Sequence, residues 1–188
     1  MMPQNAPVLA VPEGLVIEDD EWDGMLATAV MDEARAYRYL LTRIWDTSRP
    51  PMVWIMLNPS TADALADDAT IRRCTGYARR ERCGGIAVVN LFALRSTDPR
   101  ALRDHPNPVG PHNDAFLRHA TAGLGPVVVA WGAGGVLGDR AAAVTQGLTA
   151  AGVRLHALGV TSTGQPRHPL YLPRNAVLTR YTGTGAAA

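Results

Sequence analysis

Short, wholly apolar runs separated by helical patterns constrain the fold of this chain more than any other feature. The runs cover residues 52–57 (MVWIML), 86–91 (IAVVNL) and 126–131 (PVVVAW), and a fourth candidate covers 153–158. A continuous apolar run of this length is typical of a strand that is buried on both faces. Strands of this kind that alternate with helices indicate an α/β fold with a mostly parallel sheet.

The remaining patterns complete a single domain. Helices are predicted at about 67–82, 113–124 and 136–151, with a short one opened by Thr97-Asp98-Pro99. Residues 27–45 alternate around the turn Asp32-Glu33-Ala34, which predicts a β-hairpin, and 176–181 could form a last strand. We therefore expect a three-layer sandwich with a mostly parallel, four-stranded central sheet plus the N-terminal hairpin. The expected boundaries are a mobile acidic arm at 1–22, one α/β domain at 23–183 and a flexible tail at 184–188.

The charge is unevenly distributed along the chain. All 18 basic residues are arginine, and eight of the 17 acids precede residue 34, where there is no arginine. The basic remainder favours a polyanionic partner such as nucleic acid or a nucleotide, although a preference for arginine codons would produce the same bias. Because lysine is absent, Schiff-base and P-loop lysine chemistry are excluded, and with them a lyase-type glycosylase.

Cofactor and membrane signals are weak. The turn at Gly132-x-Gly134 lacks the third glycine of a dinucleotide fingerprint, since Leu137 occupies that position. A helix N-terminus there could still hold a phosphate. Cys74 and Cys83 lack zinc-ligand spacing, so we expect neither a metal nor a cofactor. With no signal peptide and no membrane-length apolar run, the expected location is cytoplasmic, without a membrane partner. The sequence indicates no oligomeric state.

The candidate site follows from where polar residues close the apolar runs. Ligands of open α/β sheets bind beyond the carboxyl ends of the strands. Asn58 follows the first run and is held rigid by Pro59, Asn90 ends the second, and His168 lies in a proline-flanked loop after the fourth. Each has a structural alternative: an Asx-turn for Asn58, a satisfied buried amide for Asn90 and a structural imidazole for His168.

Further residues surround these three in the prediction. Asp68 is a candidate catalytic group, although an acid at a helix start is commonly a cap. Phosphate contacts are predicted for Arg72, Arg73 and Arg167. The other predicted substrate contacts are Pro59, Ser60, Thr61, Asp63, Asn90, Phe92, Arg95, Trp131, Pro169 and Tyr171.

These residues fall in strings that resemble a known family. MLNPSTAD, DDATIRRC, NLFALRSTDP, VVVAWG and PRHPLYL, spread from about Tyr37 to Leu172, are similar to the bacterial domain-of-unknown-function family 1643. That family carries no established reaction.

A more distant similarity links the order of these motifs to the uracil-DNA glycosylase superfamily. Asn58-Pro59 resembles the motif that holds the attacking water, with Ser60 in place of a glycine. His168-Pro169 resembles the last motif, with Leu170 in place of a serine, and Asn90 corresponds to a base-reading asparagine.

This resemblance implies a nucleobase-recognising protein with a glycosylase-like fold. Its activity would be that of an N-glycosidase, a hydrolase that uses a positioned water to release a uracil-like or modified base from DNA or a nucleotide. The alternative is a non-catalytic module that binds a nucleotide or modified base on the same fold.

Overall fold

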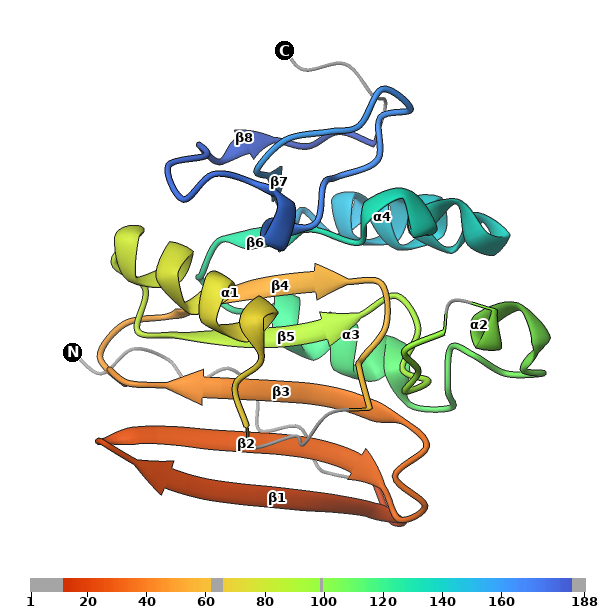
Figure 1. The fold of residues 1–188 in the computed structure, drawn as a ribbon, viewed down its shortest axis with the longest axis horizontal. Coiled ribbons are helices and arrows are strands. Elements are labelled where there is room, and N and C mark those ends of the chain that lie inside the picture. The colour runs from red at the N-terminus through yellow and green to blue at the C-terminus, as the bar shows by residue number, and fades with distance from the viewer. Residues whose placement is uncertain (1–11, 62–65, 99, 184–188) are drawn as a thin grey trace.

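Within the computed structural model, which describes residues 12–61, 66–98 and 100–183, the strands form one mixed sheet of eight. The order across the sheet is β1-β2-β3-β5-β4-β6-β7-β8, from the lower to the upper edge of Figure 1. The strands are β1 (Leu15–Trp22), β2 (Met25–Asp32), β3 (Arg38–Ile44), β4 (Pro51–Met56), β5 (Gly85–Asn90), β6 (Val127–Val129), β7 (Leu155–Ala157) and β8 (Thr179–Arg180).

The apolar runs of the sequence form the middle of this sheet. β4 pairs in parallel with β5 on one side and with β6 on the other, and β6 pairs in parallel with β7. The expected four-stranded sheet is too small, because antiparallel pairs extend it at both edges. The hairpin β2–β3 is present as predicted, but it joins the main sheet through β3 and β5 instead of forming a separate appendage.

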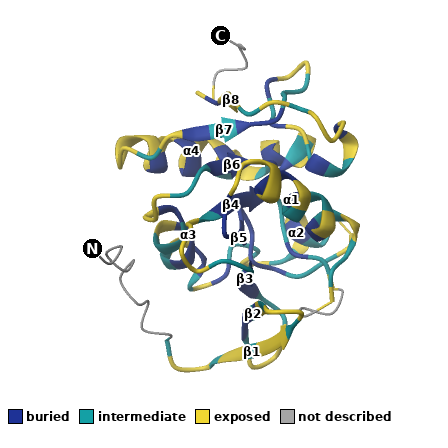
Figure 2. Ribbon diagram, turned by 90° about the vertical axis from the view of Figure 1, so that its left-hand side faces the viewer, coloured by how far each residue is buried: buried dark blue, intermediate teal, exposed yellow. Residues whose placement is uncertain are grey.

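The N-terminal prediction needs a correction. Residues 15–22 are not part of a mobile arm, because they form β1 and pair along their whole length with β2. The strand went unrecognised because it is an edge strand, largely exposed in Figure 2, so acidic side chains replace the apolar alternation that a half-buried strand shows. Residues 1–11 and the tail 184–188 lie outside the described residues.

Helices cover both faces of the sheet, which gives three layers (Figure 1). α1 (Ala69–Arg80) covers one face, here called the α1 face. α2 (Ala101–Asp104), α3 (Asn113–Thr121) and α4 (Arg140–Ala150) pack on the other, here called the α3–α4 face. The 3-10 segments η1 (Gly132–Asp139) and η2 (Pro169–Tyr171) complete the list. No helix in the described ranges has both the length and the apolar character needed to cross a lipid bilayer.

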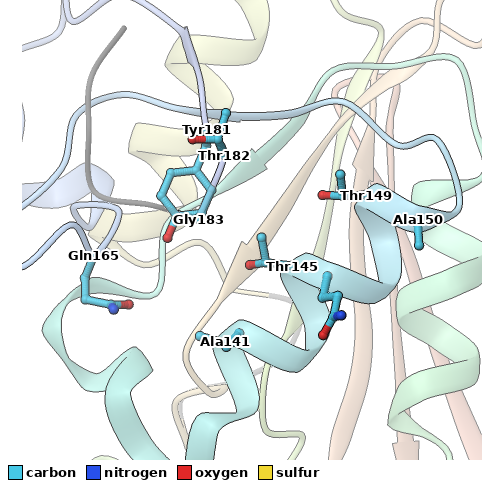
Figure 3. Close-up of a pocket in the computed structure, with 10 residues that line it drawn as sticks. Ala141, Thr145, Thr149, Ala150, Gln165, Tyr181, Thr182 and Gly183 are labelled. Carbon is cyan, nitrogen blue, oxygen red and sulfur yellow. The ribbon is translucent and has the colours of Figure 1, made fainter.

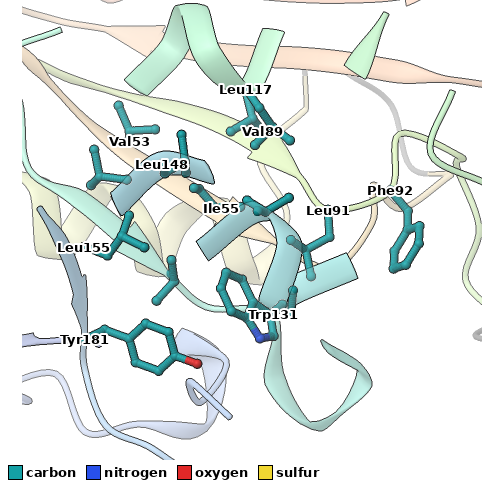
Figure 4. Packing of buried hydrophobic residues seen from close by; sticks show 14 of the residues in the cluster. Val53, Ile55, Val89, Leu91, Phe92, Leu117, Trp131, Leu148, Leu155 and Tyr181 are labelled. Carbon is teal, nitrogen blue, oxygen red and sulfur yellow. The ribbon is translucent and has the colours of Figure 1, made fainter. Parts of the chain in front are cut away.

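The pleat of the central strands divides the core between the two faces. Trp54, Ile86 and Val88 pack under α1, whereas their strand neighbours Ile55 and Val89 pack under α3 and α4 (Figure 4). This alternation follows from the two-residue period of a strand. It also determines on which face each polar residue at the carboxyl edge must lie.

Candidate functional site

Asp68 lies at the N-terminus of α1, above the carboxyl edge of the sheet. Its Oδ1 accepts a hydrogen bond of 2.8 Å from the backbone N–H of Ile71, so it is the N-cap of the helix, as the sequence had left open. The cap leaves the carboxylate charge in the site, where it acts electrostatically on both Arg38 and His168. Asp68 therefore acts electrostatically on one residue of the sheet and one of the His168 loop.

Asn90 ends β5 on the α1 face, in line with Ile86 and Val88. The residue is only 3% exposed, yet its side-chain amide forms no hydrogen bond with any residue that the structure describes. Neither polar atom of this amide is completely shut off from solvent, so both atoms retain access to the space at the carboxyl edge of the sheet. A buried amide without a partner is costly, which makes Asn90 a candidate for ligand contact.

Arg38 is a site residue that sequence reasoning missed. It begins β3, whose antiparallel pairing with β5 through Leu41 and Val88 places the start of β3 beside the end of β5. The residue is 7% exposed, and no hydrogen bond to its guanidinium is found among the described residues. In the sequence, Arg38 lies between Tyr37 and Tyr39, at a position that strand alternation predicts to be exposed. Nothing in the sequence therefore indicates that this arginine is buried at the site.

A β-bulge explains why Arg38 lies on the α1 face. Val30 of β2 pairs with Leu40, but Met31 pairs with Arg38, so Tyr39 is an extra residue. The ring of Tyr39 stacks on Phe116 of α3, with centroids 5.3 Å apart, on the opposite face. Without the extra residue, strand alternation would direct Arg38 toward that face as well. Bulges of this kind re-aim a side chain at a functional site.

The electrostatic surroundings of Arg38 are mainly positive. Burial is the main cause that lowers its pKa to about 10; the nearby charges of Arg95 and Arg43 contribute to this lowering in smaller measure, and Asp68 opposes it. The guanidinium is still charged at neutral pH, so the fold holds a cation at the edge of its core. Such a group favours an anionic partner.

His168 faces the same region from the loop before η2. Its Cβ lies 3.9 Å from the position that a Cβ on Gly132, the first residue of η1, would occupy. Burial lowers its pKa below the ordinary value, with Asp68 acting in the opposite direction, so the ring is neutral at pH 7. Since Nδ1 accepts a 3.3 Å hydrogen bond from the N–H of Leu170, the proton resides on Nε2. His168 therefore offers a neutral N–H donor.

The side-chain amide of Asn58 is partly occupied by hydrogen bonds to nearby loop carbonyls. Its Nδ2 donates to the carbonyl oxygens of Ser96 at 2.8 Å and of Pro59 at 3.1 Å, which is the structural role considered in the sequence analysis. These bonds fix the amide so that Oδ1 is left as an acceptor. Arg95 supports this loop by donating to the carbonyl oxygens of Ser60 and Thr61, which explains its presence without a substrate contact.

Two predicted substrate contacts lie on the wrong face. Phe92 and Trp131 are 3% and 2% exposed and belong to the cluster under α3 and α4 (Figure 4). The indole Nε1 of Trp131 donates to Oε1 of Gln165 at 2.8 Å. The structure therefore does not bring these two rings together with Asn90. Trp131 ends an apolar run and is directed to the α3–α4 face by the pleat, whereas Phe92 lies beyond the end of β5 and packs on that same face.

The predicted phosphate-binding arginines lie farther out on α1. Arg72 and Arg73 line a hollow of about 520 Å³ between α1 and η2, together with Leu170 and Arg174. Leu170 is two positions from His168 and Ala69, also in the lining, follows Asp68, so this basic hollow borders the site. Arg167 is exposed and donates to the carbonyl oxygen of Tyr171.

The other predicted residues of the loops are distributed over the rim. Pro59 and Pro169 are buried, Ser60 is half-buried, and Thr61 and Tyr171 are exposed. The centroid of the Tyr171 ring lies 5.7 Å from that of the His168 ring, so the two rings are neighbours. Asp63 lies outside the described residues.

The glycine-rich turn after β6 serves packing. A Cβ on Gly135 would lie 2.1 Å from the Trp131 ring, and one on Gly134 would lie 2.5 Å from a methyl of Leu57. The segment forms η1, and α4 begins only at Arg140, with Asp139 in the left-handed region as its cap. The suggested phosphate site at a helix directly after these glycines is therefore not formed.

A second hollow, of about 550 Å³, lies between α4 and the C-terminal segment (Figure 3). Its lining has no charged side chain and consists mainly of alanine and threonine residues, with Gln165 and Tyr181 at one end.

Cys74 and Cys83 are buried free thiols, and burial raises the pKa of both. In the described part of the chain, no group of three or more His, Cys, Asp or Glu residues is arranged to hold a metal ion.

Comparison with known proteins places the chain in one family. Residues 38–170 match the model of a family described as "Protein of unknown function (DUF1643)". Neither the curated proteins nor the solved structures contain a match. The matched segment starts at Arg38 and includes Asn58, Asp68, Asn90 and His168. Because this model covers more than half of the chain, the protein belongs to the DUF1643 family.

Proposed function

We propose that the carboxyl edge of the α1 face recognises a nucleobase. The observation that carries this proposal is the side chain of Asn90, which is nearly buried and has no hydrogen-bond partner in the described residues. An unpaired buried amide costs about 1–3 kcal/mol, and a ligand that pairs with it removes this cost.

The chemistry of a primary amide limits what such a ligand can be. Oδ1 accepts while Nδ2 donates, so the best partner carries an adjacent acceptor and donor in one plane. The edges of nucleobases have this arrangement, and an asparagine can pair with them bidentately. The excess of arginine on and around α1 suits the phosphate of a nucleotide or of nucleic acid.

Calorimetric titration with free bases, nucleosides and 5′-mononucleotides tests the proposal. Wild type should bind at least one base, and Asn90→Ala should weaken that binding at least tenfold, as expected for lost base-edge hydrogen bonds. Gln146→Ala, which removes an exposed amide from α4 on the other face, is the matched control. If Asn90→Ala binds as tightly as wild type, or if no base binds wild type, the proposal is wrong.

An N-glycosidase activity is the second candidate, supported by Asn58 and His168. The fixed Oδ1 of Asn58 can accept a hydrogen bond from a water, and the neutral His168 can donate from Nε2 to a carbonyl of the base. In this reaction the C1′–N bond breaks and its electron pair leaves with the base. The water oxygen bonds to C1′, and the proton that the water loses ends on the base nitrogen.

Release of free base, followed by chromatography, separates the enzyme from the binding module. The substrates are single- and double-stranded oligonucleotides with uracil or other deaminated bases, and the matching mononucleotides; in DNA the base would have to be flipped out of the stack. An enzyme releases base, and His168→Ala slows it by about 10²-fold. A wild-type protein that binds bases but releases none is a binding module.

A further inference from the structure

The two edges of the sheet carry opposite charge, a feature that is independent of the proposed function. β1 forms one edge and β8 forms the other, so the first and the last strand of the fold are the outermost two (Figure 1). We propose that the β1 edge of one copy of this chain pairs with the β8 edge of a second copy, so that the protein associates head to tail.

The edge formed by β1 is acidic. Four consecutive acids occupy residues 18–21, and among the described residues only Glu18 has an ion-pair partner, Arg35. The strand is largely exposed (Figure 2). Two copies of β1 would repel each other, because their pairing would bring acids opposite acids. The β1 edge therefore favours a basic strand as its partner.

The edge formed by β8 is basic. Arg180 is one of the two residues of this strand, and its side chain is exposed. The chain after Asp139 contains five arginines and no acid, so β7 and β8 carry no carboxylate of their own. The chain therefore supplies both a basic edge and the acidic edge that complements it.

The main chain of β1 is available for pairing. The N–H of Glu21 donates to Oδ1 of Asp20 at 2.8 Å, so it points away from β2. Alternate residues of an antiparallel strand direct their N–H and C=O groups to the same side, so Ile17 and Asp19 share this orientation. No strand of the described residues pairs with this side of β1. Unpaired edge groups of this kind are a template for a strand from another chain.

The directions of the two edge strands allow the sheet to continue from copy to copy. Three antiparallel pairs lead from β1 to β5, the strands from β5 to β7 are parallel, and one antiparallel pair leads to β8. β1 and β8 therefore run in the same direction. A second copy in the same orientation would bring its β8 beside β1 as a parallel pair. Such a contact is heterologous, so it extends in a row unless its rotation closes a ring.

The basic side chain of β8 lies on the α1 face. Arg180 pairs with His156 of β7. The neighbours of this histidine, Leu155 and Ala157, pack in the cluster under α3 and α4. Because successive side chains of a strand point to opposite faces, His156 and its partner Arg180 are directed to the α1 face.

An acid of β1 lies on that same face. Asp20 pairs with Ala27 of β2, and this row of pairs continues through β3 to Ile86 of β5. Ile86 packs under α1, so Asp20 also belongs to the α1 face. If the sheet continues across the junction, Arg180 of one copy and Asp20 of the next lie on one face and attract each other.

Sedimentation velocity of the full chain at a series of concentrations tests the proposal. Wild type should associate reversibly at low salt and lose about tenfold or more in association constant at about 0.5 M salt, because the Debye length shortens from about 10 Å at 0.1 M to about 3 Å at 1 M. Asp20→Lys and Arg180→Asp should each weaken association by about tenfold, since each brings like charges together. The double variant Asp20→Lys/Arg180→Asp exchanges both signs and should regain part of the loss.

The controls reverse exposed charges away from the two edges. Asp104→Lys on α2 and Arg118→Asp on α3 should associate as wild type does, and circular dichroism confirms that every variant is folded. A wild type that stays monomeric at low salt and at every concentration overturns the proposal. Association that either edge variant leaves unchanged, or that the controls weaken equally, also contradicts it. A double variant that associates no better than the single ones would show that the two charges do not meet.

Discussion

Arg38 and Arg43 lie on the same strand, and both side chains are buried, but their surroundings differ. Arg43 has an ion pair with Asp67, a hydrogen bond to a main-chain carbonyl and the Trp22 ring 5.3 Å away. Arg38 has none of these contacts within the described ranges. Burial alone therefore does not distinguish a structural arginine from a candidate functional one. The distinction comes from whether the fold supplies the partners.

Two buried asparagines repeat the contrast across the sheet. On the α3–α4 face, Nδ2 of Asn113 donates to the carbonyl oxygens of Asn90 and Leu91 at 2.9 and 3.0 Å. The side chain of Asn90, on the α1 face, has no partner in the described part of the chain. One asparagine thus holds the end of β5 in place, and the other is the proposed contact for a ligand.

The largest expected effect sharpens the arginine comparison. Arg43→Met should lower the free energy of unfolding by about 3 kcal/mol, because it leaves the partly buried Asp67 without its partner. Urea denaturation measures the loss. The double variant Arg43→Met/Asp67→Asn should recover part of it, since no unpaired charge remains. If the double variant is less stable than Arg43→Met, the unpaired charge of Asp67 does not cause the loss, and the structural role given to Arg43 is wrong.

The asparagine comparison predicts the next largest effect. Asn113→Ala should cost about 2 kcal/mol, since it removes two buried hydrogen bonds to the main chain. Asn90→Ala should change stability by less than about 1 kcal/mol, because it removes no bond that the fold makes. Thermal melts of the two variants give the answer. Equal losses would show that Asn90 also serves the fold.

A substitution of Gln165 tests whether Trp131 serves the fold on the α3–α4 face and not the candidate site. Gln165→Ala leaves the buried indole N–H without an acceptor, so it should cost about 1–2 kcal/mol. Base binding should be unchanged, because the indole lies on the face opposite Asn90. Calorimetry with the best base and a denaturation curve on the same sample check both expectations, and weakened binding would place Trp131 in the site after all.

The smallest effect is a pH dependence that arises from His168. Burial lowers the pKa of this imidazole in the folded state below its ordinary value of 6.5. As pH falls through 6.5 toward the folded-state value, the unfolded chain takes up a proton that the folded chain resists, so stability falls. His168→Gln should remove a fraction of one proton from the pH slope of stability in this window. An unchanged slope would mean that the ring is not desolvated.

The sequence predicted the central strands and the hairpin, and it left a cap at Asp68 open beside a catalytic role, because each depends on local patterns: apolar runs, alternation and an acid before a helix. It did not predict β1, whose exposed acidic residues hide its pairing. It placed Trp131 and Phe92 in the site because both lie near the end of a strand, and that position does not reveal on which face of the sheet a side chain packs. Arg38 was missed for a related reason, since a one-residue bulge reverses the side on which it lies.

The stability of Arg38→Met without ligand tests the central claim most directly. Urea denaturation of wild type and of this variant is measured in a chloride buffer free of phosphate, carboxylates and nucleotides. If Arg38 is kept for a ligand, removing its unpaired buried charge leaves the free energy of unfolding equal to that of wild type or raises it by about 1 kcal/mol. A loss of about 2 kcal/mol or more, approaching that of Arg43→Met, would show that Arg38 holds the fold together and would contradict the account.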